Sequence, residues 1–114
     1  MSNIQNEFIA MSNEKDWKLF RKRLPEWQER HMQTLLDEYA AIIVANENPS
    51  SRFWKLEERL RKDVRHVGVS TTMKRSTMRM NLRELFREKA ITMEDLDGFS
   101  DDLKRYISFF CQRT

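Results

Sequence analysis

Apolar side chains recur every three or four positions along most of the chain, the spacing that places them on one face of an α-helix. The clearest case lies between residues 25 and 46, where the apolar stripe consists of Met32, Leu35, Leu36, Tyr39, Ile42 and Ile43. No segment shows the strict alternation that is typical of a β-strand. The pattern therefore predicts an all-α fold in which residues 25–46 form the main helix of the core.

Pro25 predicts a boundary between two helices in the first half of the chain. A residue that precedes proline disfavours the helical conformation, so Leu24 should end a helix that begins near residue 12. Proline itself suits the first turn of a helix, so Pro25 should begin the helix over 25–46.

Residues 1–12 are expected to form a short N-terminal helical arm. Three apolar residues stand at helical spacing in this segment, namely Ile4, Phe8 and Met11. A helix this short is marginal by itself, so the arm should either dock on the rest of the domain or fray.

The next break lies at Asn48 and Pro49, after which Ser50 or Ser51 should begin a helix over 52–67. Its predicted inward stripe consists of Phe53, Leu56, Leu60 and Val64. Gly68 should close this helix, because glycine readily adopts the left-handed conformation at a helix end.

Two further helices complete the predicted bundle. One runs over 72–90, with Met78, Leu82, Leu85 and Phe86 facing inward. Thr92 and Asp95 then form a capping pair, and Ser100 caps the last helix. That helix contains the apolar residues Leu103, Tyr106, Ile107 and Phe110.

Composition supports a single helical domain over residues 1–114. The chain contains only 2 Gly and 2 Pro, too little turn chemistry for a many-stranded sandwich or barrel. A compact bundle of four to five main helices is expected, with a radius of gyration of about 13 Å.

The sequence predicts a cytoplasmic protein without a membrane segment. Its longest apolar run, Tyr39 to Ala45, is far shorter than the roughly 20 residues of a membrane-spanning helix. The first residues do not resemble a signal peptide. The single cysteine, Cys111, allows no intrachain disulfide, which agrees with a reducing compartment.

Positive charge is concentrated in the middle of the chain. Residues 50–91 hold twelve basic and five acidic side chains, whereas the segments on either side are mildly acidic. Four arginines follow one side of the predicted helix over 72–90, and we call them the arginine row: Arg75, Arg79, Arg83 and Arg87. Like charges four residues apart oppose helix formation, so the row should attract anions from outside its own helix.

Two interpretations of the arginine row remain open. The row could contact a phosphate or an acidic protein, since guanidinium suits both. It could equally be neutralised within the fold, and the candidate acids are Asp95, Asp97, Asp101 and Asp102. A helix-turn-helix around Gly68 is disfavoured, because Val64 occupies a position where that motif prefers a small residue.

No catalytic residue, metal ligand or cofactor is expected. His31 and His66 are 35 residues apart, and neither has a second ligand at metal-binding spacing. The acids around Gly98 do not match the ligand positions of a calcium loop. Cys111 has no base nearby in sequence, and two glycines 30 residues apart cannot build a phosphate loop.

Several blocks of the chain resemble a family of short, uncharacterised bacterial cytosolic helical proteins. The blocks are Trp17–Arg21, Leu24–Arg30, Phe53–Glu57, Ile91–Leu96 and Phe99–Leu103. The resemblance implies a small cytosolic helical protein, and it supplies no catalytic residue.

These observations predict a non-enzymatic interaction module whose partner is another protein or a second copy of itself. Trp54 directly follows Phe53 and lies about 100° away from it on the helix, so it is a candidate aromatic anchor for that partner. The arginine row would orient an acidic surface. The alternative is a nucleic-acid-binding protein that uses the same four arginines.

Overall fold

The computed structural model describes the backbone of residues 3–112 and the side chains of residues 14–110. The four α-helices of this part are α1 (Asn3–Val44), α2 (Pro49–Asp63), α3 (Met78–Arg87) and α4 (Asp101–Gln112). Short 3-10 helices span Arg75–Thr77 and Met93–Leu96. The described residues contain no strand, so the prediction of an all-α fold is confirmed.

The predicted boundary at Pro25 is wrong, because α1 runs through it as one helix of 42 residues. Pro25 lacks an N–H and cannot donate to the Arg21 carbonyl, which costs the helix one hydrogen bond. The apolar face compensates: Leu24 and Trp27 are 1% and 4% exposed and lie on the same side of α1. Burial on both sides of the proline therefore outweighs its local preference.

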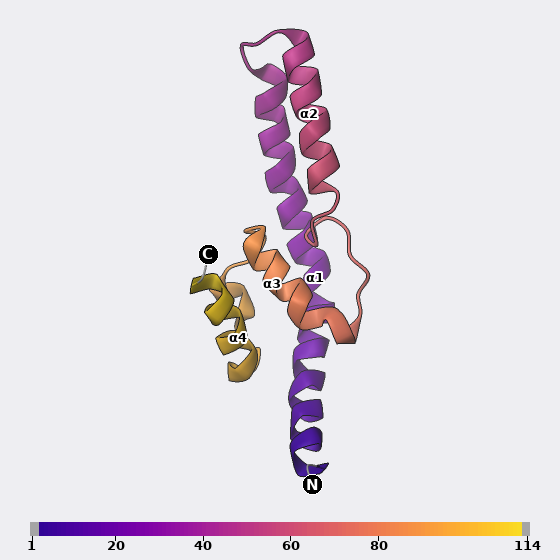
Figure 1. Cartoon of the computed structure of the whole chain (residues 1–114), viewed down its shortest axis with the longest axis vertical. Helices are drawn as coiled ribbons and strands as arrows, with labels where there is room; N and C mark the ends of the chain where they lie inside the picture. The colour runs from indigo at the N-terminus through magenta and orange to yellow at the C-terminus, as the bar shows by residue number, and fades with distance from the viewer. Residues whose placement is uncertain (1–2, 113–114) are drawn as a thin grey trace.

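The molecule is long and narrow, measuring 65 × 26 × 22 Å. An uninterrupted helix of 42 residues is about 63 Å long, so α1 sets the long axis. The radius of gyration is 17.7 Å, larger than the roughly 13 Å expected for a compact bundle of this length. In Figure 1, α2 runs back along one end of α1, while α3 and α4 pack beside the middle of α1.

The core lies where α3 and α4 meet the middle of α1 (Figure 1). It contains Trp17, Phe20, Leu24 and Trp27 of α1, Met78, Leu82 and Leu85 of α3, and Leu103 and Ile107 of α4. The inward positions predicted for these residues of α3 and α4 are confirmed. On α1 the main core thus extends from Trp17 to Trp27 and ends before the apolar stripe that was expected to form it, which begins at Met32.

The apolar stripe of α2 is not buried, which corrects the prediction for this helix. Phe53, Leu60 and Val64 are 63%, 48% and 54% exposed. On α1, Leu36 and Ile43 are 56% and 50% exposed. The physical reason is that the α1–α2 hairpin extends beyond α3 and α4, so none of the described helices covers this surface.

Local capping signals in the second half are confirmed. The Thr92 N–H donates to the Asp95 carboxylate at 2.8 Å, and the Leu103 N–H donates to the Ser100 hydroxyl at 3.2 Å.

Ser100 also joins α4 to α1, because its N–H and its hydroxyl donate to Asp16 at 2.8 and 2.6 Å. Asp16 is a buried carboxylate, 2% exposed.

Several predicted helix ends differ from the structure. α2 begins at Pro49, after Asn48, and not after Ser50 or Ser51. α2 ends at Asp63 rather than near residue 67, and Gly68 does not adopt the left-handed conformation. The helix predicted over 72–90 is shorter and is closed by Lys89, whose φ is 62°. The predicted arm over residues 1–12 continues into α1 from Asn3, and its side chains lie outside the described residues.

Candidate functional site

The α1–α2 hairpin presents an uncovered apolar surface formed by both of its helices. We call it the hairpin face; its residues are Leu36, Ile43, Phe53, Leu60 and Val64, each between 48% and 63% exposed. Leu36 and Ile43 are seven residues apart on α1, as are Phe53 and Leu60 on α2, so each pair lies on one side of its helix.

Two hollows follow this surface along the groove between the helices. One has a volume of about 220 Å³, and its lining includes Leu36, Tyr39, Leu60 and Val64. The other has a volume of about 210 Å³ and lies nearer the turn of the hairpin, lined by Ile43, Pro49, Arg52, Phe53 and Leu56. Each hollow is lined by side chains of both helices, so a partner could contact the groove along much of its length.

Trp54 lies next to the hairpin face and is 63% exposed. Its ring packs edge-on against Phe53, with centroids 5.1 Å apart and an interplanar angle of 84°. Two adjacent aromatic rings, both largely exposed, provide a rigid apolar surface of the kind found at interaction hot spots. Contact between Trp54 and a partner stays a prediction.

The two helices of the hairpin carry opposite net charge. Residues 31–44 of α1 contain Asp37 and Glu38 and no lysine or arginine, whereas α2 contains five basic and three acidic side chains. One pair already links the helices, since Arg59 donates to Glu38 at 2.6 Å. The part of α1 within the hairpin is therefore acidic, whereas α2 is basic.

The arginine row makes contacts within the fold. Arg75 pairs with Glu14 and Arg79 with Asp102, both at 2.9 Å. The guanidinium groups of Arg79 and Arg83 lie over the rings of Tyr106 and Phe110, at 4.6 and 4.7 Å. Arg87 lies 3.8 Å from Glu84 of its own helix.

Arg79 and Arg83 therefore join α3 to α4, and Arg75 joins the 3-10 helix before α3 to α1. Asp102 is one of the acids expected to neutralise the row, whereas Asp95 pairs instead with Arg30 at 2.8 Å. The side chains of Arg75 and Arg87 remain 58% and 61% exposed. Binding of an external anion by the row therefore stays a prediction.

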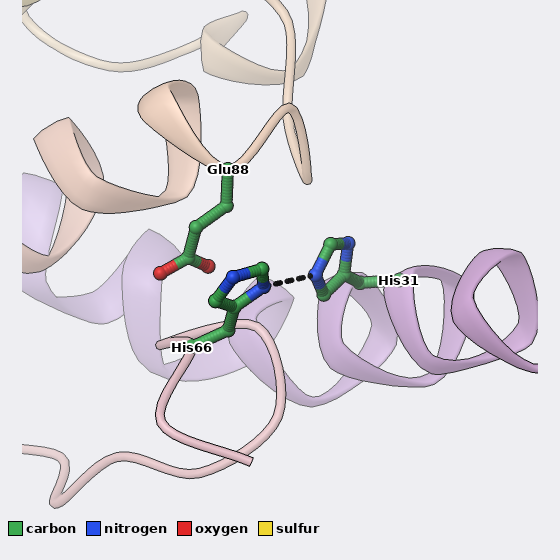
Figure 2. Close-up of side chains that lie close together, drawn as sticks. All are labelled: His31, His66 and Glu88. Carbon is green, nitrogen blue, oxygen red and sulfur yellow. Dashed lines mark hydrogen bonds between the residues drawn. The ribbon is translucent and has the colours of Figure 1, made fainter. Parts of the chain in front are cut away.

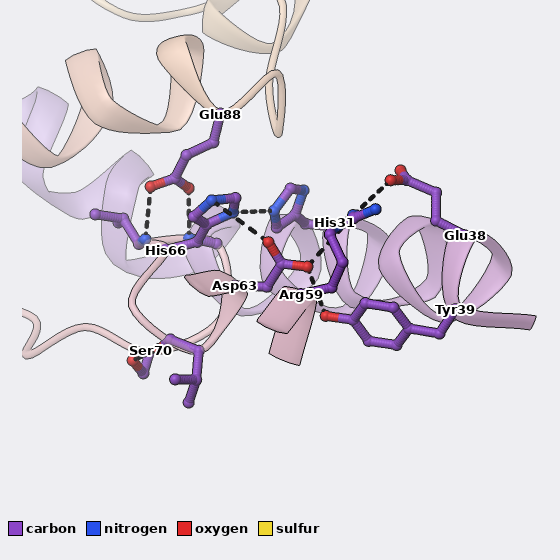
Figure 3. A network of polar contacts seen from close by, with 11 residues as sticks. His31, Glu38, Tyr39, Arg59, Asp63, His66, Ser70 and Glu88 are labelled. Carbon is purple, nitrogen blue, oxygen red and sulfur yellow. Dashed lines mark hydrogen bonds and ion pairs between the residues drawn. The ribbon is translucent and has the colours of Figure 1, made fainter. Parts of the chain in front are cut away.

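A buried polar network occupies the base of the hairpin (Figure 3). The Tyr39 hydroxyl donates to Asp63 at 2.7 Å, and Arg59 lies 3.4 Å from the same carboxylate oxygen. Burial, together with the hydrogen bond to Asp63, raises the pKa of Tyr39 to about 12. The phenol therefore keeps its proton and continues to donate at neutral pH.

Next to this network, three segments bring His31, His66 and Glu88 together (Figure 2). His31 belongs to α1, His66 follows α2, and Glu88 follows α3. His31 Nε2 lies 3.1 Å from His66 Nδ1. Burial lowers the pKa of His31, and the neighbouring His66 lowers it further, so the His31 ring is neutral at pH 7.

The spacing of His31 and His66 along the chain did not match a metal-binding motif. The sequence nevertheless contains one indication that the two histidines lie close together. His31 stands seventeen residues before Asn48, and His66 stands seventeen residues after Pro49. Two antiparallel helices joined at that break place equidistant residues side by side. The position of Glu88 has no such signal, because it depends on how α3 packs.

Comparisons with known proteins identify no relative: no protein-family model, no curated protein and no solved structure matches the chain. Among the described residues, no helix is both long enough and apolar enough to cross a membrane. The predicted resemblance to short bacterial helical proteins stays a prediction.

Proposed function

We propose that this chain is a non-enzymatic interaction module whose partner is a second copy of itself, bound through the hairpin face. The observation that supports the proposal is the exposure of five large apolar side chains across both helices of the hairpin. Exposed apolar patches of this kind mark interaction sites in soluble proteins.

The size of the hairpin face suits a dimer. A large apolar side chain that is half exposed presents on the order of 100 Å², so the face presents roughly 500 Å² per copy. Two copies would bury about 1,000 Å² of apolar area, and polar residues at the rim would extend this toward the 1,200–2,000 Å² of a stable interface. The product would be a four-helix bundle, in which each hairpin supplies the helices that the other lacks.

Charge favours one arrangement of the two copies. A two-fold axis parallel to the hairpin would place α1 of each copy against α2 of the other. The acidic segment 31–44 would then lie beside the basic α2, which is electrostatically complementary. Trp54 would contact the partner at the rim of this interface.

Sedimentation equilibrium over a range of protein concentrations tests the proposal. We expect a dimer for the unaltered chain and a monomer for Leu60→Glu, because the substitution places two buried charges in the interface. Met80→Glu is the matched control, since Leu60 and Met80 are both 48% exposed but Met80 lies on α3. The control should remain dimeric, and circular dichroism should show unchanged helix content in both variants.

Two results would overturn self-association. One is a chain that remains monomeric at every concentration, and the other is a Leu60→Glu variant that dimerises as tightly as the unaltered chain. Nucleic-acid binding is the alternative function, and no observation favours it. Binding to duplex DNA that weakens steeply with salt, and is lost when Arg79 and Arg83 become Glu, would support that alternative instead.

A further inference from the structure

We propose that His31, His66 and Glu88 form a binding site for a divalent transition-metal ion, with Zn²⁺ as the best fit. One ligand atom from each of the three residues lies within 4.8 Å of the other two. The residues come from α1, from the segment after α2 and from the residue after α3, as Figure 2 shows. A bound ion would therefore tie the base of the hairpin to the end of α3.

The distance between the two imidazoles fits a shared ion. Tetrahedral zinc with Zn–N bonds of about 2.0–2.1 Å separates two nitrogen ligands by about 3.3 Å. His31 Nε2 and His66 Nδ1 are 3.1 Å apart, so a shift of a few tenths of an ångström would accommodate the metal. Without an ion, the same two atoms share a hydrogen bond.

The environment of His66 is suited to a metal ligand. If Nδ1 binds the ion, the proton lies on Nε2, and that atom is 3.8 Å from an oxygen of Asp63. This distance is too long for a hydrogen bond, so the two groups would have to approach. A carboxylate that accepts the N–H of a ligating histidine orients the ring and increases its basicity. Asp63 is itself positioned by Tyr39 and Arg59, as Figure 3 shows.

Glu88 is held in place by the backbone of the segment that contains His66. Its two carboxylate oxygens accept the N–H groups of Val67 and Gly68, at 2.8 and 3.0 Å. Each oxygen retains a second lone pair that can bind a metal. A carboxylate already ordered in this way loses little entropy when it coordinates an ion.

The ligand set selects the class of metal. Two imidazoles and one carboxylate suit Zn²⁺ and neighbouring transition metals, whereas Mg²⁺ and Ca²⁺ prefer oxygen ligands alone. Three protein ligands leave a fourth tetrahedral position for water. The charges of Glu88 and the nearby Asp63 would offset the charge of the ion.

Isothermal titration of the chelator-treated 114-residue chain with ZnCl₂ tests the site. We expect one ion per chain and a rise in the thermal midpoint, because the ion binds the folded form and stabilises it by mass action. His66→Ala should weaken binding by about 100-fold or more, since removing a group that only orients a ligand already costs 10–100-fold in metal affinity. The His66 side chain is 31% exposed, so its removal should leave helix content unchanged.

Two control variants separate this site from other zinc ligands. Cys111→Ser removes the single thiol of the chain, and Glu94→Gln removes an exposed acid outside the cluster. Both should bind Zn²⁺ as tightly as the unaltered chain. The proposal is overturned if the unaltered chain binds no zinc at stoichiometric concentration, if His66→Ala binds with unchanged affinity, or if Cys111→Ser abolishes binding.

Discussion

Replacing Gly68 by alanine tests the packing at the base of the hairpin. A Cβ at this position would lie 2.5 Å from His31 Cδ2 and 2.9 Å from His31 Cγ. Carbon atoms in contact are normally about 3.5–4.0 Å apart, so the overlap approaches about 1 Å. The His31 ring is 5% exposed and stacks on His66, with ring centroids 5.4 Å apart, so it has little room to move.

The expected loss of stability follows from two opposing effects. Overpacking in a well-filled interior costs about 1–3 kcal/mol. Because Gly68 lies outside the left-handed region, alanine adds no backbone strain there. Alanine also lowers the conformational entropy of the unfolded chain, which stabilises the folded state by about 0.4–1 kcal/mol. We therefore expect Gly68→Ala to lower the free energy of unfolding by about 1–2 kcal/mol.

Equilibrium urea unfolding, with a chelator present and at one protein concentration, measures this change. The sharper test is a double-mutant cycle with His31→Ala, which removes the ring that the new Cβ would meet. In that background, Gly68→Ala should be neutral or slightly stabilising. An equal loss of stability in both backgrounds would refute the steric explanation, as would a Gly68→Ala variant that is more stable than the unaltered chain.

Three further predictions concern other parts of the fold. Lys89→Gly should raise the free energy of unfolding by about 1 kcal/mol in urea titrations, because Lys89 closes α3 at a φ of 62°. Asp16→Ala should lower that free energy by about 2–4 kcal/mol, since Ser100 loses the acceptor for its N–H and its hydroxyl. Tyr39→Phe should reduce the loss of stability at alkaline pH. The pKa of Tyr39 is raised to about 12, so the folded chain keeps a proton that the unfolded chain releases near pH 10. The free energy of unfolding of the unaltered chain therefore falls between these two pH values.

Each of these predictions has an outcome that contradicts it. An unchanged or lower urea midpoint for Lys89→Gly would mean that the left-handed residue is not strained. If Asp16→Ala costs less than Ser100→Ala, the buried carboxylate does not anchor α4. For Tyr39→Phe, stability should be compared with that of the unaltered chain from pH 9 to 12, and identical profiles would show that the phenol does not contribute to the alkaline loss.

Interactions between near neighbours could be predicted from the sequence. The capping pair Thr92 and Asp95 is confirmed because its partners are three residues apart and need no other part of the fold. Ser100 as the first cap of α4 is confirmed for the same reason. The inward residues of α3 and α4 also follow from helical spacing, since a single stripe can face a single core.

Predictions that depended on competition between local preference and burial were wrong. Pro25 should have ended a helix, but burial of Leu24 and Trp27 extends α1 through it. Gly68 was expected to supply a left-handed turn, whereas its missing side chain makes room for His31. For Pro25, the burial that decides the outcome comes from packing of α1 against α3 and α4. For Gly68, it is the close approach of His31, which lies on α1 and is distant in sequence.

By itself the sequence determined that the chain is helical, that Thr92 with Asp95 and Ser100 act as caps, and which side of each helix is apolar. Only the tertiary structure decided what covers those apolar sides, leaving Leu60 and its neighbours exposed on the hairpin while burying Trp27. It also decided that His31 meets His66 and Glu88. The physical reason is that periodicity and capping arise from neighbours within about four residues, whereas burial and side-chain clusters depend on which distant segments pack together.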